Sequence, residues 1–129
     1  MRYLLDTHVL LWMRENNPKL SRQKWEPILL SPDNKVLVSI VSLWEITVKQ
    51  SLGKLSLDGS MSQFAGDLES KYGFEILPLT PSDLDRVSRL PRHHDDPFDR
   101  LLIAQALEAG AMAVTNDCRW RKYRCKVQW

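Results

Sequence analysis

Short apolar runs typical of buried strands alternate along this chain with longer segments whose apolar residues recur at helical spacing. Val36-Leu37-Val38 is a clear strand core, because β-branched residues favour extended backbone. The next segment starts at Ser39 or Ser42, repeats apolar residues at helical spacing and ends at Gly53. Such alternation implies an α/β fold with a mostly parallel sheet and helices on both of its faces.

The same reasoning extends to the rest of the chain and predicts one domain over residues 1–129, a normal domain length. Asp96-Pro97 opens the clearest helix, with Gly110 as its stop, whereas Pro27 predicts a kink or a late start in the second helix. We predict strands at residues 3–5, 36–38, 74–77, 111–114 and 126–129, and helices at 7–14, 21–30, 39–52, 62–72, 81–90 and 96–109.

Composition excludes several classes of protein. Hydrophobic residues make up 43% of the chain, enough for a core, and no apolar run approaches the roughly 18 residues of a membrane span. The start of the chain is interrupted by Asp6 and His8 and shows no signal-peptide cleavage site. Cys118 and Cys125 match no zinc or redox motif and favour free thiols. We therefore expect a soluble cytoplasmic protein.

The net charge of +2 is uninformative, but one basic segment stands out. Residues 119–126 hold five basic residues and two aromatic residues without any acid. Such a segment is typical either of a patch that attracts phosphate or of a solvated face beside a C-terminal strand, and the pattern does not decide between them.

Four acidic residues are the candidates for a functional site, although each also has an ordinary structural explanation when taken alone. Asp6 could cap a helix and Asp117 could serve a turn. Asp99 would be the third helical residue after a cap at Asp96, yet it shares a face with apolar residues. Glu45 could pair with Lys49 one turn later, but it stands between two valines.

Taken together, the four acids predict a cation site. Three of them are expected shortly after strands and Glu45 on the helix after a strand, so all four meet at the edge where parallel α/β sheets bind ligands. Converging carboxylates repel one another unless a cation neutralises them. Oxygen ligands favour Mg²⁺ or Mn²⁺, and such ions usually act on phosphates by activating water.

The segments around these acids resemble the four acidic motifs of PIN domains, in order and over nearly the whole chain. They are Leu4-Leu5-Asp6-Thr7-His8, Ser42-Leu43-Trp44-Glu45-Ile46, the most specific stretch His94 to Ala106, and Val114-Thr115-Asn116-Asp117. The subgroup that the chain most resembles is the VapC-type toxins of bacterial type II toxin–antitoxin pairs.

This resemblance implies a three-layer α/β/α sandwich and a metal-dependent endoribonuclease that leaves 5′-phosphate and 3′-hydroxyl ends. It also implies a homodimer, a cognate antitoxin protein and an RNA substrate. The implied metal-binding and catalytic acids are Asp6, Glu45, Asp99 and Asp117. Asp96, Thr7, Thr115 and Asn116 are accessory candidates, and the candidates for RNA contact are His94, Arg100, Arg119, Arg121 and Lys122. His8 is interpreted as a helix-start residue.

Two alternatives stay open. A phosphatase or a phospho-receiver domain also uses an acidic pocket at a strand end, but Asp6 is followed by Thr7 and His8 rather than by a second early acid. A catalytically inactive module that binds RNA or a partner protein is the other alternative. Cleavage of RNA that is lost on chelation would separate these classes.

Overall fold

The computed structural model describes residues 1–129 and contains a five-stranded sheet in which every neighbouring pair of strands is parallel. The strand order is β3-β2-β1-β4-β5. The strands are β1 (Arg2–Leu5), β2 (Lys35–Ser39), β3 (Glu75–Leu77), β4 (Met112–Val114) and β5 (Val127–Gln128). Parallel neighbours need crossover connections, and the helices between the strands provide them. The predicted α/β class is confirmed.

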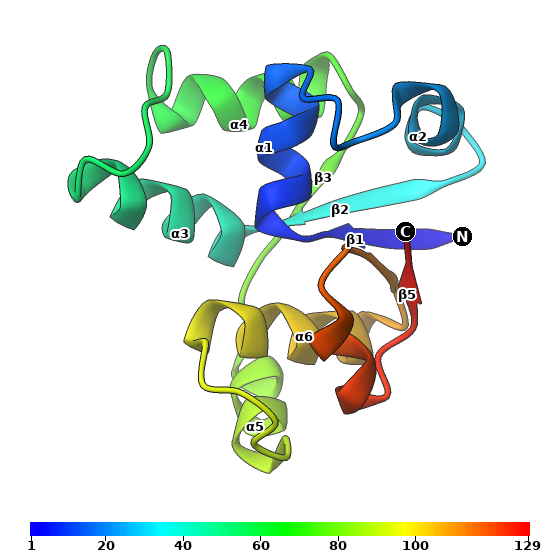
Figure 1. The fold of residues 1–129 in the computed structure, drawn as a ribbon, viewed down its shortest axis with the longest axis vertical. Helices are drawn as coiled ribbons and strands as arrows, with labels where there is room; N and C mark the ends of the chain where they lie inside the picture. Colours follow the sequence, from blue (N-terminus) through cyan, green and yellow to red (C-terminus); the bar gives the residue numbers. More distant parts are fainter.

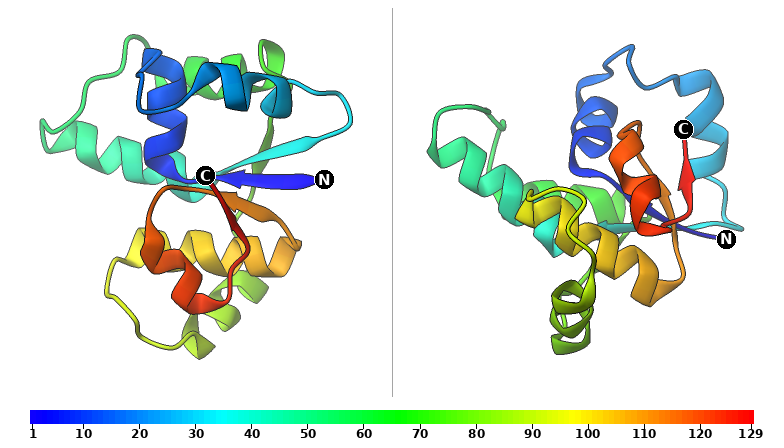
Figure 2. Two further views of the ribbon diagram at one scale, coloured as in Figure 1. Left: turned by 45° about the vertical axis from the view of Figure 1, so that its right-hand side comes forward. Right: turned by 60° about the horizontal axis from the view of Figure 1, so that its bottom comes forward.

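Helices cover both faces of the sheet and make three layers (Figures 1 and 2). One layer holds the first four helices and the other holds the last three. The first layer is α1 (Thr7–Glu15), α2 (Arg22–Leu29), α3 (Ile40–Ser51) and α4 (Met61–Ser70). The second is α5 (Pro81–Arg89), α6 (Pro97–Ala109) and the 3₁₀ helix η1 (Cys118–Tyr123). No helix is both long and apolar enough to span a membrane.

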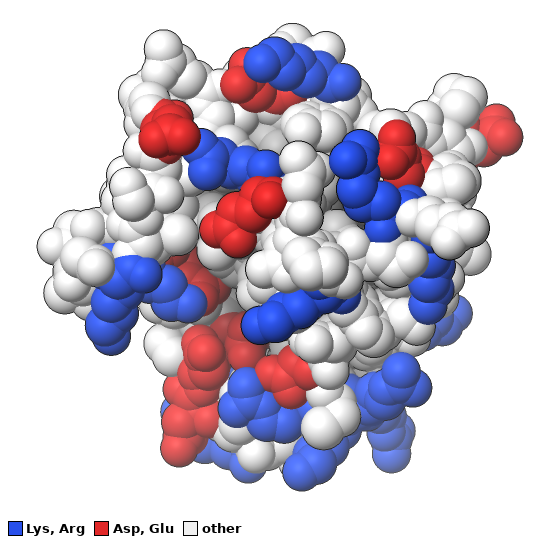
Figure 3. Space-filling model, turned by 45° about the horizontal axis from the view of Figure 1, so that its top comes forward, with Lys and Arg blue, Asp and Glu red and all other residues white.

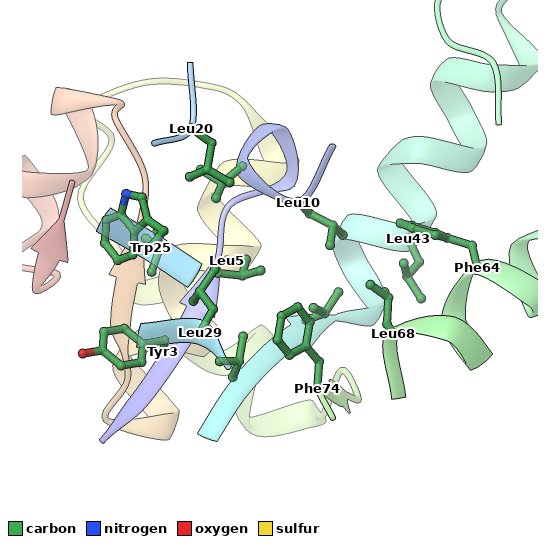
Figure 4. Packing of buried hydrophobic residues seen from close by; sticks show 14 of the residues in the cluster. Tyr3, Leu5, Leu10, Leu20, Trp25, Leu29, Leu43, Phe64, Leu68 and Phe74 are labelled. Carbon is green, nitrogen blue, oxygen red and sulfur yellow. The ribbon is translucent and has the colours of Figure 1, made fainter. Parts of the chain in front are cut away.

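The central strands have buried side chains on both faces, as a covered parallel sheet requires. Tyr3 and Leu5 of β1 pack in the core beneath α1 to α4, which Figure 4 shows from close by. Leu4, between them, points to the opposite core with Leu37 and Ala113. Because side chains alternate along a strand, one short strand supplies both cores.

Helix ends follow the capping chemistry expected from the sequence. The Ser39 and Asp96 side chains accept backbone N–H groups at the starts of α3 and α6, and Gly110 ends α6 in the left-handed conformation with φ of 61°. Pro27 lies inside α2, which begins at Arg22 without a late start. Several predicted ends are off by one or two residues, since terminal turns fray.

Two features differ from the prediction. Residues 118–123 form η1, a 3₁₀ helix that the sequence pattern did not indicate. Asp99 does not follow a strand closely, because α5 and a loop separate β3 from α6. It reaches the carboxyl edge of the sheet on the first turn of α6, whereas Asp6 arrives directly from the end of β1.

Substitution of Leu5 by Ala is expected to lower the free energy of unfolding by about 2–5 kcal/mol, because it leaves a cavity in a packed core. Leu5 is fully buried, whereas Leu84 on α5 is 52% exposed and provides the matched control. Urea denaturation of Leu84→Ala should shift by less than about 0.5 kcal/mol. Equal losses in the two variants would contradict the packing described.

Candidate active site

The four acids and Asp96 line one cleft of about 170 Å³ at the carboxyl edge of the sheet. The remaining lining residues include Thr7, His8, Lys49 and Arg119. The cleft forms because β1 and β4 are neighbours and because the first turns of α1, α3 and α6 begin beside their ends. The structure therefore brings together the acids that are separate in sequence.

Asp6 occupies the N-cap position of α1, but its side chain makes no capping bond. Instead its Oδ2 accepts a 2.6 Å hydrogen bond from Thr115 Oγ1 and lies 3.2 Å from His8 Nδ1. Burial raises the pKa of Asp6, and a charged His8 and the Thr115 hydroxyl partly oppose that rise. The plain capping interpretation of Asp6 is thus wrong, and its carboxylate faces the cleft.

Glu45 satisfies the ordinary interpretation and the functional one at once. Its Oε2 lies 2.6 Å from Lys49 Nζ, which is the predicted pair one helical turn apart. Its side chain is only 8% exposed, and the second oxygen, Oε1, is buried without any hydrogen-bond partner. A buried carboxylate oxygen without a partner is costly and is expected to have a further ligand.

Asp99 is the most strongly perturbed of the acids. Asp96 caps α6 by accepting the N–H groups of Phe98 and Asp99, which holds Asp99 on the helix face toward the cleft. Burial raises the pKa of Asp99 to about 8, with further contributions from Asp6, Asp96, Asp117 and Glu45. Burial first, and the neighbouring acids second, therefore favour the protonated form of Asp99.

Asp117 is held by its own turn and by one arginine. The Arg119 N–H donates to Asp117 Oδ1 at 3.0 Å, and Asp117 N–H donates to Thr115 Oγ1. The Arg119 guanidinium bonds both carboxylate oxygens, with its closest contact at 2.6 Å. These hydrogen bonds lower the pKa of Asp117.

His94 connects Asp99 to Tyr123 of η1. His94 Nδ1 lies 2.7 Å from Tyr123 Oη, and its Nε2 lies 3.4 Å from Asp99 Oδ2. Tyr123 Oη also accepts the backbone N–H groups of His93 and His94. The loop before α6 is thereby tied to η1, and the His94 ring lies between Tyr123 and Asp99.

Arg100 points away from the cleft. Its guanidinium is buried and donates to the carbonyl oxygens of Val87, Leu90 and Pro91. Its donors are engaged with the backbone that precedes α6, which argues against the expected contact with RNA.

The other accessory candidates divide into those near the cleft and those outside it. Thr7 lines the cleft and donates its hydroxyl to Ser42 Oγ at 3.0 Å. Asn116 Oδ1 lies 2.8 Å from His8 Nε2. Arg121 and Lys122 are exposed on η1 and are not among the lining residues. On the face drawn in Figure 3, basic side chains lie interspersed with acidic ones rather than in one broad patch.

Two groups of residues at the site escaped the sequence interpretation. His8 contacts both Asp6 and Asn116, and the only available signal was its position two residues after an acid at a strand end. Trp44 and Phe98, each next to a cleft acid in sequence, pack edge to face with ring centroids 4.9 Å apart. Trp44 is 53% exposed beside the site.

The donor set of the cleft fits a hard divalent cation. It is composed of carboxylates, it includes the partnerless Oε1 of Glu45, and its mutual repulsion is the kind that a cation relieves. As the side chains stand, no group of three or more His, Cys, Asp or Glu residues is arranged to hold an ion. Lys49 contacts Glu45, Arg119 contacts Asp117, and the His8 ring lies beside Asp6.

Comparison with known proteins agrees with this architecture. The family model described as PIN domain matches residues 3–125. The chain belongs to the PIN domain family. A curated relative, Ribonuclease VapC22 of Mycobacterium tuberculosis, is 28% identical over 122 residues, which cover 94% of this chain and 91% of that protein.

Solved structures of similar fold agree with this family assignment. VapBC2 from Rickettsia felis, bound to a promoter DNA fragment, superposes with a TM-score of 0.73 at 17% identity, covering 99% of this chain and 98% of the other. VapBC-1 from nontypeable Haemophilus influenzae gives 0.69 at 19% identity, covering 99% and 97%. At sequence identities of 17% and 19%, this structural similarity establishes the fold alone.

The raised pKa of Asp99 predicts how the stability of the metal-free protein changes with pH. The Asp99 carboxyl binds its proton more tightly in the folded protein than in the unfolded chain. Its stabilising contribution to the free energy of unfolding is therefore complete below about pH 4 and is lost as the pH rises through about 8. Asp99→Asn removes this dependence. At high pH the variant should be more stable than the wild type by about 1–3 kcal/mol.

Thermal unfolding from about pH 5 to about pH 9 in chelator measures this difference. The melting temperature of the wild type should fall relative to that of Asp99→Asn across this range. Parallel profiles for the two proteins would show that Asp99 titrates normally.

Proposed function

We propose that this PIN domain is a metal-dependent endoribonuclease, and that it is the toxin of a toxin–antitoxin pair. The observation that carries the proposal is the one cleft in which Asp6, Glu45, Asp99 and Asp117 meet, where burial and then the acidic neighbours raise the pKa of Asp99. The 28% identity to a ribonuclease over 94% of the chain supports RNA as the substrate.

Each part of the cleft has a defined task in this proposal. The four acids would hold Mg²⁺ or Mn²⁺, which supplies an activated water and stabilises charge on the phosphate. Thr115 orients Asp6 through its 2.6 Å bond, and the Asp96 cap and His94 orient Asp99. Such supporting contacts preserve the geometry of ligands and tune their basicity.

The proposed partners follow from the neighbouring structures. A similar fold, with a TM-score of 0.66 at 16% identity, is a toxin–antitoxin complex from Klebsiella pneumoniae, which supports a cognate antitoxin protein for this chain. A homodimer is part of the same proposal. We place the protein in the cytoplasm, where an RNA-cleaving toxin would meet its substrate.

Asp99→Asn is expected to abolish RNA cleavage, with a loss of at least about 100-fold, because it removes a charged ligand from the cleft without changing its shape. Asp95→Asn provides the matched control, since Asp95 is four residues away, is 89% exposed and pairs only with Arg92. Cleavage of a labelled RNA pool by both variants, folded as judged by circular dichroism, makes the test. Full activity of Asp99→Asn would remove this acid from the mechanism.

Chelation tests the class of the enzyme. The wild type should lose cleavage in chelator and regain it with excess Mg²⁺ or Mn²⁺, and sequencing of the released ends should find 5′-phosphates and 3′-hydroxyls. Cleavage that persists in chelator would contradict a metal-dependent nuclease. RNA binding without cleavage under any metal would instead support the inactive-module alternative.

Metal binding should also stabilise the folded protein. An ion that binds only the folded state at about 100 times its dissociation constant adds about 2.7 kcal/mol to the free energy of unfolding. We expect the melting temperature to rise by several degrees with saturating Mn²⁺ in the wild type and to rise less in Asp99→Asn. Equal shifts in the two proteins would place the bound ion elsewhere.

A further inference from the structure

Arg119 occupies the carboxylates that a cation would need. Its Nε donates to both oxygens of Asp117 and its Nη2 donates to Oδ2, and Nη2 also lies 3.6 Å from Asp99 Oδ2. When hydrogen bonds from a guanidinium engage both oxygens of a carboxylate, neither oxygen is readily available to bind an ion. Arg119 therefore spans two of the four acids, one from the end of β4 and one from α6.

The other cations at the cleft do not have this effect. Lys49 contacts one oxygen of Glu45 and leaves Oε1 without a partner, and His8 lies beside Oδ2 of Asp6 alone. Those contacts allow each acid to keep an oxygen for a further ligand. Arg119 alone contacts two of the acids at once.

Arg119 is also free to leave. Its side chain is 48% exposed, so its guanidinium can swing into solvent without opening a cavity. Asp117 would keep its place after that movement, because its Oδ1 also accepts the Arg119 backbone N–H and its own N–H donates to Thr115 Oγ1. The acid is held by the turn, and the guanidinium is an additional, removable partner.

We propose that Arg119 is a built-in counter-ion of this site that competes with the divalent cation for Asp117 and Asp99 and leaves the cleft when the ion binds. This inference rests on the proposed metal site. Without an ion, Arg119 offsets the repulsion among the acids. With an ion bound, its guanidinium stands free at the rim of the cleft.

Calorimetric titration with Mn²⁺ in the absence of RNA tests the competition. Arg119→Ala should bind Mn²⁺ about fivefold more tightly than the wild type, a factor typical of one partly exposed ion pair. Arg121→Ala removes the same charge from the same 3₁₀ helix, where Arg121 is exposed and makes no ion pair, and it should leave the affinity near that of the wild type. Arg119→Lys keeps the charge but cannot bond both carboxylate oxygens as a guanidinium does, so its affinity for Mn²⁺ should lie between those of Arg119→Ala and the wild type.

Nuclear magnetic resonance gives a readout independent of affinity. Titration of the wild type with diamagnetic Mg²⁺ should move the Arg119 Nε–Hε resonance from its bonded position to that of a solvated guanidinium, in step with binding. The resonances of Arg121 and Arg124 should stay unchanged.

The outcomes separate the two claims. If the wild type binds ions and Arg119→Ala binds them equally or more weakly, Arg119 organises Asp117 rather than competes, and the inference is overturned while the metal site stands. An Arg119 resonance that does not move when the site is saturated with Mg²⁺ overturns the inference in the same way. If neither the wild type nor the variant binds an ion, the proposed metal site and the inference both fail.

Discussion

Mutual repulsion among buried carboxylates is the constraint on which the rest of this structure depends. Burial and four neighbouring acids raise the pKa of Asp99, and the protein offsets that repulsion with cations of its own. Lys49 contacts Glu45 and Arg119 contacts Asp117, so positive charge of the protein itself balances part of the negative charge of the cleft. Under the proposed function, the remaining repulsion among the acids is what a divalent ion would relieve.

The sheet explains why the repulsion is tolerated at this edge. Both faces of the central strands are packed, and the alternation of Tyr3, Leu4 and Leu5 serves two cores at once. This packing holds the ends of β1 and β4 side by side, with Asp6 N–H bonded to the Val114 carbonyl. The free energy that holds the acids together thus comes from apolar burial away from the cleft.

Local sequence patterns predicted the elements and most of their caps. The sequence predicts Asp96 as a cap and offers Ser39 or Ser42 as the start of α3, because short polar side chains bond free N–H groups at helix starts, and the structure selects Ser39. The same patterns could not find η1, because a basic segment with two aromatic residues lacks a clear period. Local pattern alone also left open whether the Asp6 side chain caps its own helix, whereas in the structure its carboxylate accepts a hydrogen bond from Thr115.

The sequence by itself determined which side chains carry charge, the order of strands and helices, and the four acids that a parallel sheet would gather at one edge. Only the tertiary structure decided which partner each charge meets. Arg100 turns toward backbone carbonyls, Arg119 turns toward Asp117, and Tyr123 meets His94 across 29 residues of chain. The physical reason is that such contacts depend on packing between distant segments, which no local periodicity encodes.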